Sequence, residues 1–208
     1  MPYGYLGTQP NQTVKNTGVL SVTEAAELQS QGKLGGSLEL IQEQSHSSDV
    51  AIVDFTSIKE NVYDVHLLQF NSLSTDGTSS NIRLQFYESG VLETASVYQF
   101  ARQIGETSGS FSENRSTAAA EIEISNYKGS IRTGSGYIYL YNLGNSSKYS
   151  FCTFQTFGGH STDQIFFGGG VLPQASAVNG IRILGGAGTV DMTDFTFKLY
   201  GVKQIWVT

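Results

Sequence analysis

Residue types that perform chemistry in enzymes are few in this sequence and lie far apart. His46, His66 and His160 are its three histidines, and Cys152 is its one cysteine. The histidines have neither the i, i+4 spacing nor the H-E-x-x-H motif of a zinc-binding helix, and one cysteine cannot form a disulfide within the chain or a multi-cysteine metal cage. No G-x-S-x-G motif marks a nucleophilic serine. The sequence therefore predicts no metal site and no cofactor.

One pair of carboxylates has a spacing that suits acid–base chemistry. Glu121 and Glu123 lie on the same face of an expected strand, about 7 Å apart at the rise of a strand, and inverting glycosidases hold their two carboxylates at such a distance. The pattern E-I-E-I is also typical of any strand with one wet face, because Ile122 and Ile124 then point to the core. We favour this structural interpretation and predict that the protein is not an enzyme. A glycan-cleaving enzyme is an alternative that rests on this pair alone.

Aromatic side chains form the most distinctive pattern. Three tyrosines, which we call the tyrosine stripe, alternate with aliphatic residues over 137–142: Tyr137, Tyr139 and Tyr141, with Ile138 and Leu140 between them. A tyrosine offers a rigid apolar ring with a polar hydroxyl, which suits both protein interfaces and sugar stacking. Three interpretations are open for the stripe: the inner face of a sheet, a subunit interface, or a sugar-binding platform. Trp206, the only tryptophan, is a further candidate for an interface or sugar contact.

Alternating apolar and polar residues from Val50 onward predict the strands that position these side chains. The alternation is clearest near the end of the chain, where Phe195, Phe197 and Leu199 face one way. Similar segments occupy 50–55, 61–70, 82–87, 97–104, 121–124, 137–142, 148–157 and 181–183. No helix is expected between them, so the strands should be mainly antiparallel. The sequence predicts an all-β fold, an antiparallel jelly-roll-like β-sandwich over residues 50–208, with an antiparallel barrel as the second choice.

Polar and glycine-rich segments predict the connections between these strands. Asp76-Gly77 is a dipeptide typical of a tight hairpin, and residues 105–117 are expected to be a long polar loop. Residues 158–173 are glycine-rich, and the glycines of 185–188 should form a turn into the closing strand. Residues 42–49 are expected to be a linker.

An N-terminal segment, residues 1–45, precedes the sandwich. Residues 1–17 have no periodicity, and are either an extended arm that orders against a neighbouring subunit or a floppy terminus. Ser21 and Glu24 then have the spacing of a capping box and predict one short α-helix. Its apolar positions make a possible anchoring stripe (Leu20, Val22, Ala25 and Leu28). Because a helix of about ten residues is marginal alone, we expect it to dock on another surface.

The composition limits the classes of partner. The 208 residues carry a formal net charge of −6, and only 14% are charged, against about 25% in an average soluble domain. Nucleic-acid-binding proteins present clusters of Lys and Arg, so no nucleic-acid partner is expected. No run approaches the roughly 18 apolar residues of a membrane span, and residues 1–17 lack the pattern of a signal peptide, so we expect no membrane insertion. Neutral polar surfaces suit contacts with other protein subunits.

The end of the chain also carries a family resemblance. Residues 195–203, Phe-Thr-Phe-Lys-Leu-Tyr-Gly-Val-Lys, resemble the final strand of many virion structural proteins of tailed bacteriophages, notably marine phages that infect cyanobacteria. In those proteins a glycine-containing turn leads into an F-x-L-Y-G-[VI]-K ending, as residues 185–203 do here. Residues 63–85 resemble an earlier hairpin of the same group. Residues 18–24 are similar to a G-V-x-S-[LV]-x-E segment of phage appendage proteins.

This resemblance implies a non-enzymatic structural role on the surface of a phage particle, as a capsid decoration or knob or as a tail or fibre appendage. The implied partners are other copies of the chain, with a trimer favoured, and other virion proteins. The alternative that it implies is a carbohydrate-binding receptor-recognition module of an appendage, whose partner is a host surface glycan. One departure is that this chain continues past Lys203. Its last five residues, which include Trp206, are expected to add a strand to a neighbour or to cover a sheet edge.

Overall fold

The structure is a computed structural model, which describes residues 21–30, 37–76, 80–127, 133–159 and 162–203. The chain divides into two units, Met1–Gly36 and Ser37–Thr208. The second unit is an all-β sandwich of two antiparallel sheets, and the first contains the helix α1 (Val22–Ser30). The predicted all-β sandwich is therefore confirmed.

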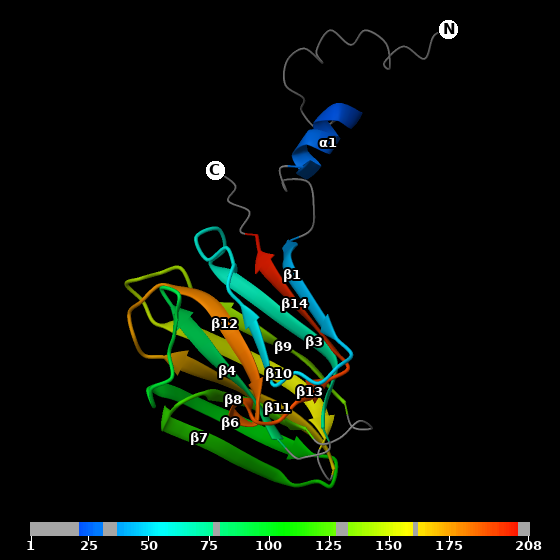
Figure 1. The fold of residues 1–208 in the computed structure, drawn as a ribbon, viewed down its shortest axis with the longest axis vertical. Helices are drawn as coiled ribbons and strands as arrows, with labels where there is room; N and C mark the ends of the chain where they lie inside the picture. The colour runs from blue at the N-terminus through cyan, green and yellow to red at the C-terminus, as the bar shows by residue number, and fades with distance from the viewer. Residues whose placement is uncertain (1–20, 31–36, 77–79, 128–132, 160–161, 204–208) are drawn as a thin grey trace, which may run out of the picture. The chain divides into compact units, whose positions relative to one another are not determined.

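The large sheet contains nine strands and the small sheet five among the described residues. In spatial order the large sheet is β1 (Leu38–His46), β14 (Phe195–Val202), β3 (Val65–Thr75), β9 (Gly134–Tyr141), β10 (Ser150–Gly159), β11 (Asp163–Leu172), β6 (Tyr98–Glu106) and β7 (Phe111–Ala119), with β13 (Met192–Thr193) also paired to β3. The small sheet is β2 (Ile52–Phe55), β12 (Val178–Gly185), β4 (Ser80–Glu88) and β5 (Val91–Leu92), with β8 (Ile122–Tyr127) also paired to β4. Figure 1 shows the two layers overlapping in its view.

The chain passes repeatedly from one sheet to the other, as in a jelly roll. β1, β3 and β6 belong to the large sheet, whereas β2, β4 and β8 belong to the small one. The core lies between the layers, where β8 packs across β6, β10 and β11. β14 alternates as predicted, with Phe195, Phe197 and Leu199 buried in this core. It pairs with β1 on one side and β3 on the other, so the closing strand fills the sheet between two earlier strands.

Two predicted connections are wrong because they are strands. The expected linker at 42–49 is mostly part of β1, which pairs with β14, and Gln44 Nε2 on β1 donates a hydrogen bond to Asp54 O (2.7 Å). The body of the protein thus begins at Ser37 and not at 50. The expected polar loop at 105–117 is mostly β7, which forms a hairpin with β6. Both are edge strands, and backbone pairing along an edge does not require the apolar alternation that marks a buried strand.

The glycine-rich segment and the expected hairpin also differ from prediction. Residues 163–172, which include three consecutive glycines, form the regular strand β11 between β10 and β6. Asp76-Gly77 follows β3, but β3 and β4 lie in different sheets, so the two strands are not a hairpin. The dipeptide permits a turn, whereas the pairing is decided by where each strand buries its apolar face.

The absence of a side chain at Gly134 and Gly158 allows a close approach at the core. Tyr127, the last residue of β8, is fully buried. A Cβ at Gly134 would lie 2.1 Å from the Tyr127 ring, and a Cβ at Gly158 would lie 2.3 Å from it. The ring of a small-sheet residue therefore occupies space that side chains on β9 and β10 would otherwise take.

The helix α1 begins with the capping box predicted from its sequence. The Ser21 hydroxyl accepts a hydrogen bond from the Glu24 amide (3.1 Å), and the Glu24 carboxylate accepts one from the Ser21 amide (2.8 Å). These two bonds satisfy amide groups that have no partner inside the helix. In the described part of the chain, no helix is long and apolar enough to cross a membrane.

Candidate functional site

The tyrosine stripe lies on the outer face of the large sheet. On β9, Ile138 and Leu140 are buried in the core, whereas Tyr137 is 38% exposed and Tyr139 and Tyr141 are half-buried. The core interpretation of the stripe is therefore wrong. The alternation predicted two faces correctly, but it did not say which face is inside, because both sets of side chains are large and apolar.

Contacts with β10 hold the stripe in place. The Tyr137 hydroxyl donates a hydrogen bond to Gln155 Oε1 (2.9 Å), and the Tyr141 hydroxyl lies 3.2 Å from Thr153 Oγ1. Tyr139 lies between the other two rings, with centroids 5.7 Å from Tyr137 and 6.3 Å from Tyr141. The three rings pack against one another, and hydrogen bonds hold the first and the last of them. Binding a partner would therefore cost little side-chain entropy.

The strand register extends the stripe into a wide apolar surface. Directly paired residues share one face of a sheet, and the partners of Tyr139 and Tyr141 on neighbouring strands are mainly apolar. Two adjacent rows across the sheet contain Leu38, Val202, Val65, Tyr141, Phe151 and Val171 in the first, and Leu40, Tyr200, Leu67 and Tyr139 in the second. Antiparallel sheets with a solvated face usually carry polar residues there. We call this surface, with its flanking residues on β10, β11 and β7, the outer face.

Phenylalanines on β10, β11 and β7 continue the outer face beyond the stripe. Phe151 and Phe167 are each 41% exposed, Phe157 is 52% exposed and Phe111 is 78% exposed. Large apolar side chains scattered singly on a surface are common, but a contiguous patch marks an interaction site. These four residues could not be identified from sequence, because they belong to strands that are apolar on both faces or to segments that were expected to be loops.

A shallow hollow interrupts the aromatic residues of the outer face. It has a volume of about 640 Å³ and lies over β10, β11, β6 and β7. Its floor contains the small residues Thr153, Gly169 and Ala101, and Phe151 and Arg115 lie at its sides. The neighbouring Cys152 faces the core instead, where burial raises the pKa of its thiol to about 12. The hollow is thus a largely apolar depression without a reactive thiol.

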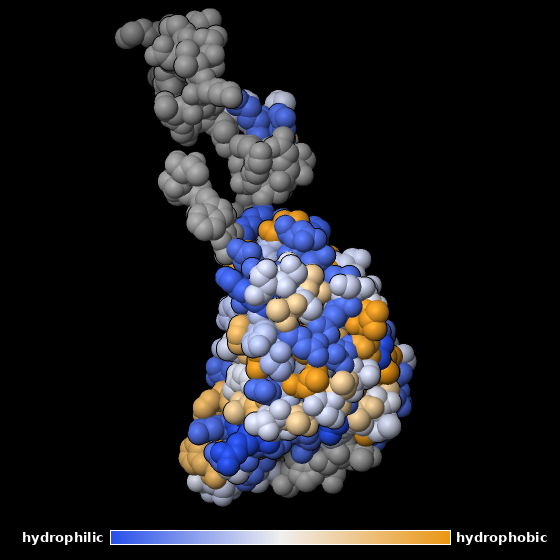
Figure 2. Space-filling view, turned by 90° about the vertical axis from the view of Figure 1, so that its left-hand side faces the viewer, coloured by the Kyte–Doolittle hydropathy of each residue, from blue (hydrophilic) through white to orange (hydrophobic). Residues whose placement is uncertain are grey.

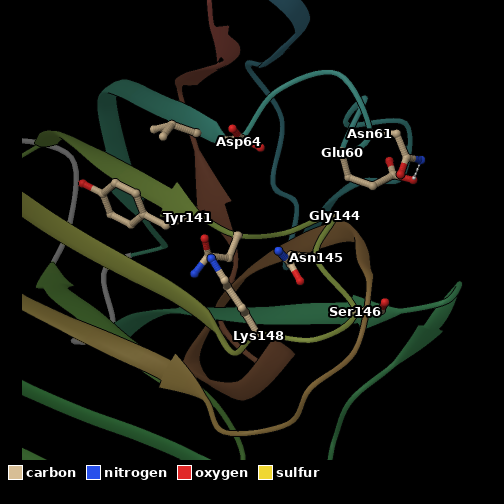
Figure 3. A pocket seen from close by; sticks show the side chains of 10 residues that line it. Glu60, Asn61, Asp64, Tyr141, Gly144, Asn145, Ser146 and Lys148 are labelled. Carbon is tan, nitrogen blue, oxygen red and sulfur yellow. Dashed lines mark hydrogen bonds between the residues drawn. The ribbon is translucent and has the colours of Figure 1, made fainter. Parts of the chain in front are cut away.

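A second, more polar pocket lies at the end of the stripe, and we call it the loop pocket (Figure 3). It has a volume of about 620 Å³ and is formed by the segments 60–65 and 141–148. Tyr141, the last residue of β9, belongs to both the stripe and this pocket. Its lining residues are Glu60, Asn61, Asp64, Val65, Tyr141, Asn142, Gly144, Asn145, Ser146 and Lys148.

Backbone hydrogen bonds set the shape of the loop pocket. Asn142 adopts a left-handed conformation (φ 62°), which asparagine tolerates better than most residues. Its amide donates to Asp64 O (3.2 Å), and its side chain donates to Tyr149 O (3.3 Å). Gly144 follows, where a Cβ would lie 2.2 Å from the carbonyl oxygen of Glu60. The two loops are therefore in direct backbone contact, and the pocket is formed before any ligand arrives.

Several polar groups of the loop pocket are free to bind a ligand. Within the described residues, neither the Asp64 carboxylate nor the Lys148 ammonium is paired with another side chain. Asn145 Oδ1 accepts a hydrogen bond from the Ser147 amide (3.0 Å), which leaves its Nδ2 as a donor. In Figure 3 Asp64 lies on one side of the pocket, and Lys148 and Asn145 lie on the other. Glu60 and Asn61 are turned toward each other and share a hydrogen bond (2.9 Å).

The carboxylate pair from the sequence is engaged in ion pairs. Arg83 contacts Glu121 (3.3 Å) and Glu123 (3.5 Å), and the buried Arg102 contacts Glu123 (3.0 Å). Asn114 Nδ2 also donates to Glu123 (2.6 Å). These ion pairs connect β4, β6 and β8. Glu121 and Glu123 therefore both have the structural role that the E-I-E-I pattern predicts.

His66, like the carboxylate pair, has a structural role in the sandwich. His66 is fully buried, with Nε2 2.7 Å from Ile58 O, and burial lowers its pKa. Among the described residues, no group of three or more His, Cys, Asp or Glu side chains is placed to hold a metal ion. His66 is thus a packing residue of the sandwich.

The remaining predicted site residues lie partly outside the described residues. Trp206 and Leu20 are outside them, as is the side chain of Leu28. Val22 and Ala25 lie on α1, where Val22 is exposed and Ala25 is half-buried. Docking of this helix on another surface remains a prediction.

The fold and its surfaces define an all-β sandwich with an apolar outer sheet face and a polar pocket at one end of it. On the side of the sandwich shown in Figure 2, apolar side chains form separate patches among polar ones. No known protein-family model matches the sequence, and no curated protein matches it.

Proposed function

We propose that the chain is a non-enzymatic structural component of a tailed-phage virion, which assembles with other copies of itself through the outer face. The observation that carries the proposal is the run of apolar side chains across the large sheet in register, from Leu38 on β1 to Val171 on β11. Burial of apolar area is the main driving force of stable protein association, and the outer face exposes large apolar side chains such as Phe151, Phe157 and Phe167.

The size of the outer face suits a specific interface. Eight strands spaced about 4.8 Å apart span roughly 35 Å, and four rows of side chains about 7 Å apart cover roughly 20 Å along the strands. The product is about 700 Å², close to the roughly 800 Å² that each partner buries in an interface of standard size. One copy of a similar sheet face can therefore cover it.

The two edges of the large sheet favour assembly through the face. β1 has a bulge at Leu40/Gln42 and carries Glu39 and Glu43, while β7 carries the exposed Glu113 and Arg115. Charges and bulges on edge strands prevent pairing with strands of other chains. Contacts between copies are thus directed away from the edges.

The phage origin is supported by the resemblance of residues 185–203. In the structure these residues form a turn with left-handed φ at Gly186, Ala187 and Gly188, the short β13, and β14. This arrangement agrees with a turn that leads into a final strand. We place the chain on the surface of the particle, as a capsid decoration or knob or as a tail or fibre appendage, with other virion proteins as further partners and a trimer as the favoured state.

The test of assembly uses charge on the outer face. In the full chain, the double variant Phe151→Glu/Phe167→Glu places two carboxylates on this surface without touching the core. We expect the parent to form an oligomer in analytical ultracentrifugation and native mass spectrometry, and the variant to be a folded monomer with an unchanged circular dichroism spectrum. The control is Val91→Glu on β5, an exposed apolar position of the small sheet (71%) whose substitution should leave assembly unchanged.

Two results would contradict the proposal. A parent that stays monomeric at high concentration, or a double variant that assembles like the parent, would exclude the outer face as an interface. The virion role is tested separately by mass spectrometry of purified particles of a phage that encodes the chain. Absence from the particles, when the chain is found in infected cells, would exclude a virion role.

A second candidate function is a carbohydrate-binding module for receptor recognition. It is favoured by the exposure of the tyrosine stripe, since aromatic rings beside polar groups are suited to stacking on sugar rings. Tyr137 lies beside Gln155 in this way. A host glycan array probed with the full chain distinguishes the two candidates, because assembly through the outer face predicts no glycan signal from the stripe.

A further inference from the structure

We propose that the loop pocket binds a neutral saccharide. The inference deepens the carbohydrate-binding candidate by assigning it a site distinct from the centre of the tyrosine stripe. Its polar residues lie on the loops 60–64 and 142–148, beyond the rows of the outer face, so these residues remain open when another subunit covers that face. A single chain then both assembles through the sheet face and binds glycan at the end of the sandwich.

The dimensions and rigidity of the pocket fit a small ligand. Its volume of about 620 Å³ lies within the roughly 300–1,000 Å³ of most small-ligand sites. The hydrogen bonds from Asn142 to Asp64 O and Tyr149 O, and the contact of Gly144 with Glu60 O, fix the two loops relative to each other. A preformed site avoids the entropic cost of ordering loops on binding.

The free polar groups match the hydroxyls of a sugar. A sugar hydroxyl donates one hydrogen bond and accepts others. Asp64 offers carboxylate acceptors, while Lys148 and Asn145 Nδ2 offer donors, and these groups come from both loops. Tyr141 adds an aromatic ring at the boundary with the stripe, against which the apolar face of a pyranose ring stacks. The pocket thus combines hydrogen-bonding groups of both kinds with one aromatic surface.

Other ligand classes fit the same residues less well. A phosphate or another strong anion would meet Lys148 as the one cation of the lining and would be repelled by Glu60 and Asp64. A metal ion would find only these two carboxylates, because the described residues contain no cluster of three metal-ligating side chains. An apolar ligand would leave the Asp64 carboxylate, the Lys148 ammonium and Asn145 Nδ2 without hydrogen bonds from the ligand, at a cost in free energy. A neutral, polyhydroxylated ligand satisfies all of them.

The experiment titrates the isotope-labelled full chain with neutral sugars, namely glucose, galactose, mannose, N-acetylglucosamine and their disaccharides. We expect at least one sugar to shift the amide resonances of residues 60–65 and 141–148 in a saturable way. The variant Asp64→Ala/Lys148→Ala removes two side chains with no side-chain partner among the described residues, so its fold should be intact. Because hydrogen bonds to charged groups are the strong ones, we expect its affinity to fall at least about tenfold.

Two controls separate the possible results. Glu113→Gln on the edge strand β7 should leave the affinity unchanged, and Tyr137→Ala tests the stripe away from the pocket. If Tyr137→Ala abolishes binding while Asp64→Ala/Lys148→Ala does not, the sugar lies on the stripe, so the pocket assignment is overturned and the carbohydrate-binding candidate stands. If no sugar shifts any resonance, both are overturned. Neither result bears on assembly, which is measured without sugar.

Discussion

At the scale of single residues, burial makes several reactive groups inert. Cys152 and His66 are buried in the core, and the Glu121 and Glu123 carboxylates are paired with arginines. The sequence predicted these structural roles, since Cys152 lies in an apolar strand and the pattern E-I-E-I is typical of a strand with one wet face. Two residue-scale consequences are measurable.

The Cys152 thiol should not react in the native protein. Burial raises its pKa to about 12, and the thiolate is the reactive form. We expect no labelling by iodoacetamide at pH 8 under native conditions and complete labelling in denaturant, measured by intact-mass spectrometry. Fast labelling of the native chain would show that the hollow beside β10 opens to the core.

Glu39 should contribute stability that depends on pH. Hydrogen bonds from Tyr63 and Lys59, with Lys203 nearby (3.4 Å), lower its pKa from 4.5 to about 2. A depressed pKa stabilises the folded state above pH 4.5, and this contribution is lost as the pH falls from 4.5 toward 2. Because the group is partly solvated, the effect should be about 1 kcal/mol or less.

The variant Glu39→Gln isolates this contribution. We expect a lower free energy of unfolding than in the parent at pH 7, and a difference that shrinks as the pH approaches 2, measured by urea denaturation across the pH range. Glu113→Gln on the opposite edge strand is the matched control, since its carboxylate is far more exposed. A difference between parent and Glu39→Gln that stays constant with pH would contradict this origin.

At the scale of elements, the spacing of the two sheets depends on glycines that face Tyr127. A Cβ at Gly158 would lie 2.3 Å from the ring, and Tyr127 is fully buried and cannot move aside freely. We expect Gly158→Ala to lower the free energy of unfolding by about 1–3 kcal/mol, the usual cost of overpacking. Urea denaturation measures this loss.

A double-mutant cycle with Tyr127→Leu identifies the cause of the loss. Removing the ring makes room for the new methyl group, so the double variant should lose less stability than the sum of the two single variants. Additive losses would show that Gly158 is required for another reason, such as its backbone conformation.

Elements with one buried face were predictable from sequence, whereas edge elements were not. β14 and β9 have the expected alternation, and the capping box of α1 places its first turn correctly. β1 and β7 were missed because an edge strand is held by backbone hydrogen bonds on one side and is solvated on the other. Its side chains therefore need not alternate between apolar and polar.

At the scale of the whole molecule, the outer face follows from the order of strands. β9 and β10 are neighbours in sequence, but β3, β14 and β6 reach the same sheet from distant parts of the chain. Their outward residues add to the tyrosine stripe to make one surface, and the loops at 60–64 and 142–148 meet at its end. The assembly and saccharide proposals both depend on this convergence.

The sequence by itself determined the fold class, the alternation of the main strands and the capped helix, because these depend on the spacing of side chains along one segment. Only the tertiary structure decided that the tyrosine stripe faces outward, that Phe151 and Phe167 lie beside it, and that Asp64 and Lys148 share a pocket. Such facts depend on which segments pair and on which side of a sheet the core forms. A local pattern of residues is the same for either side.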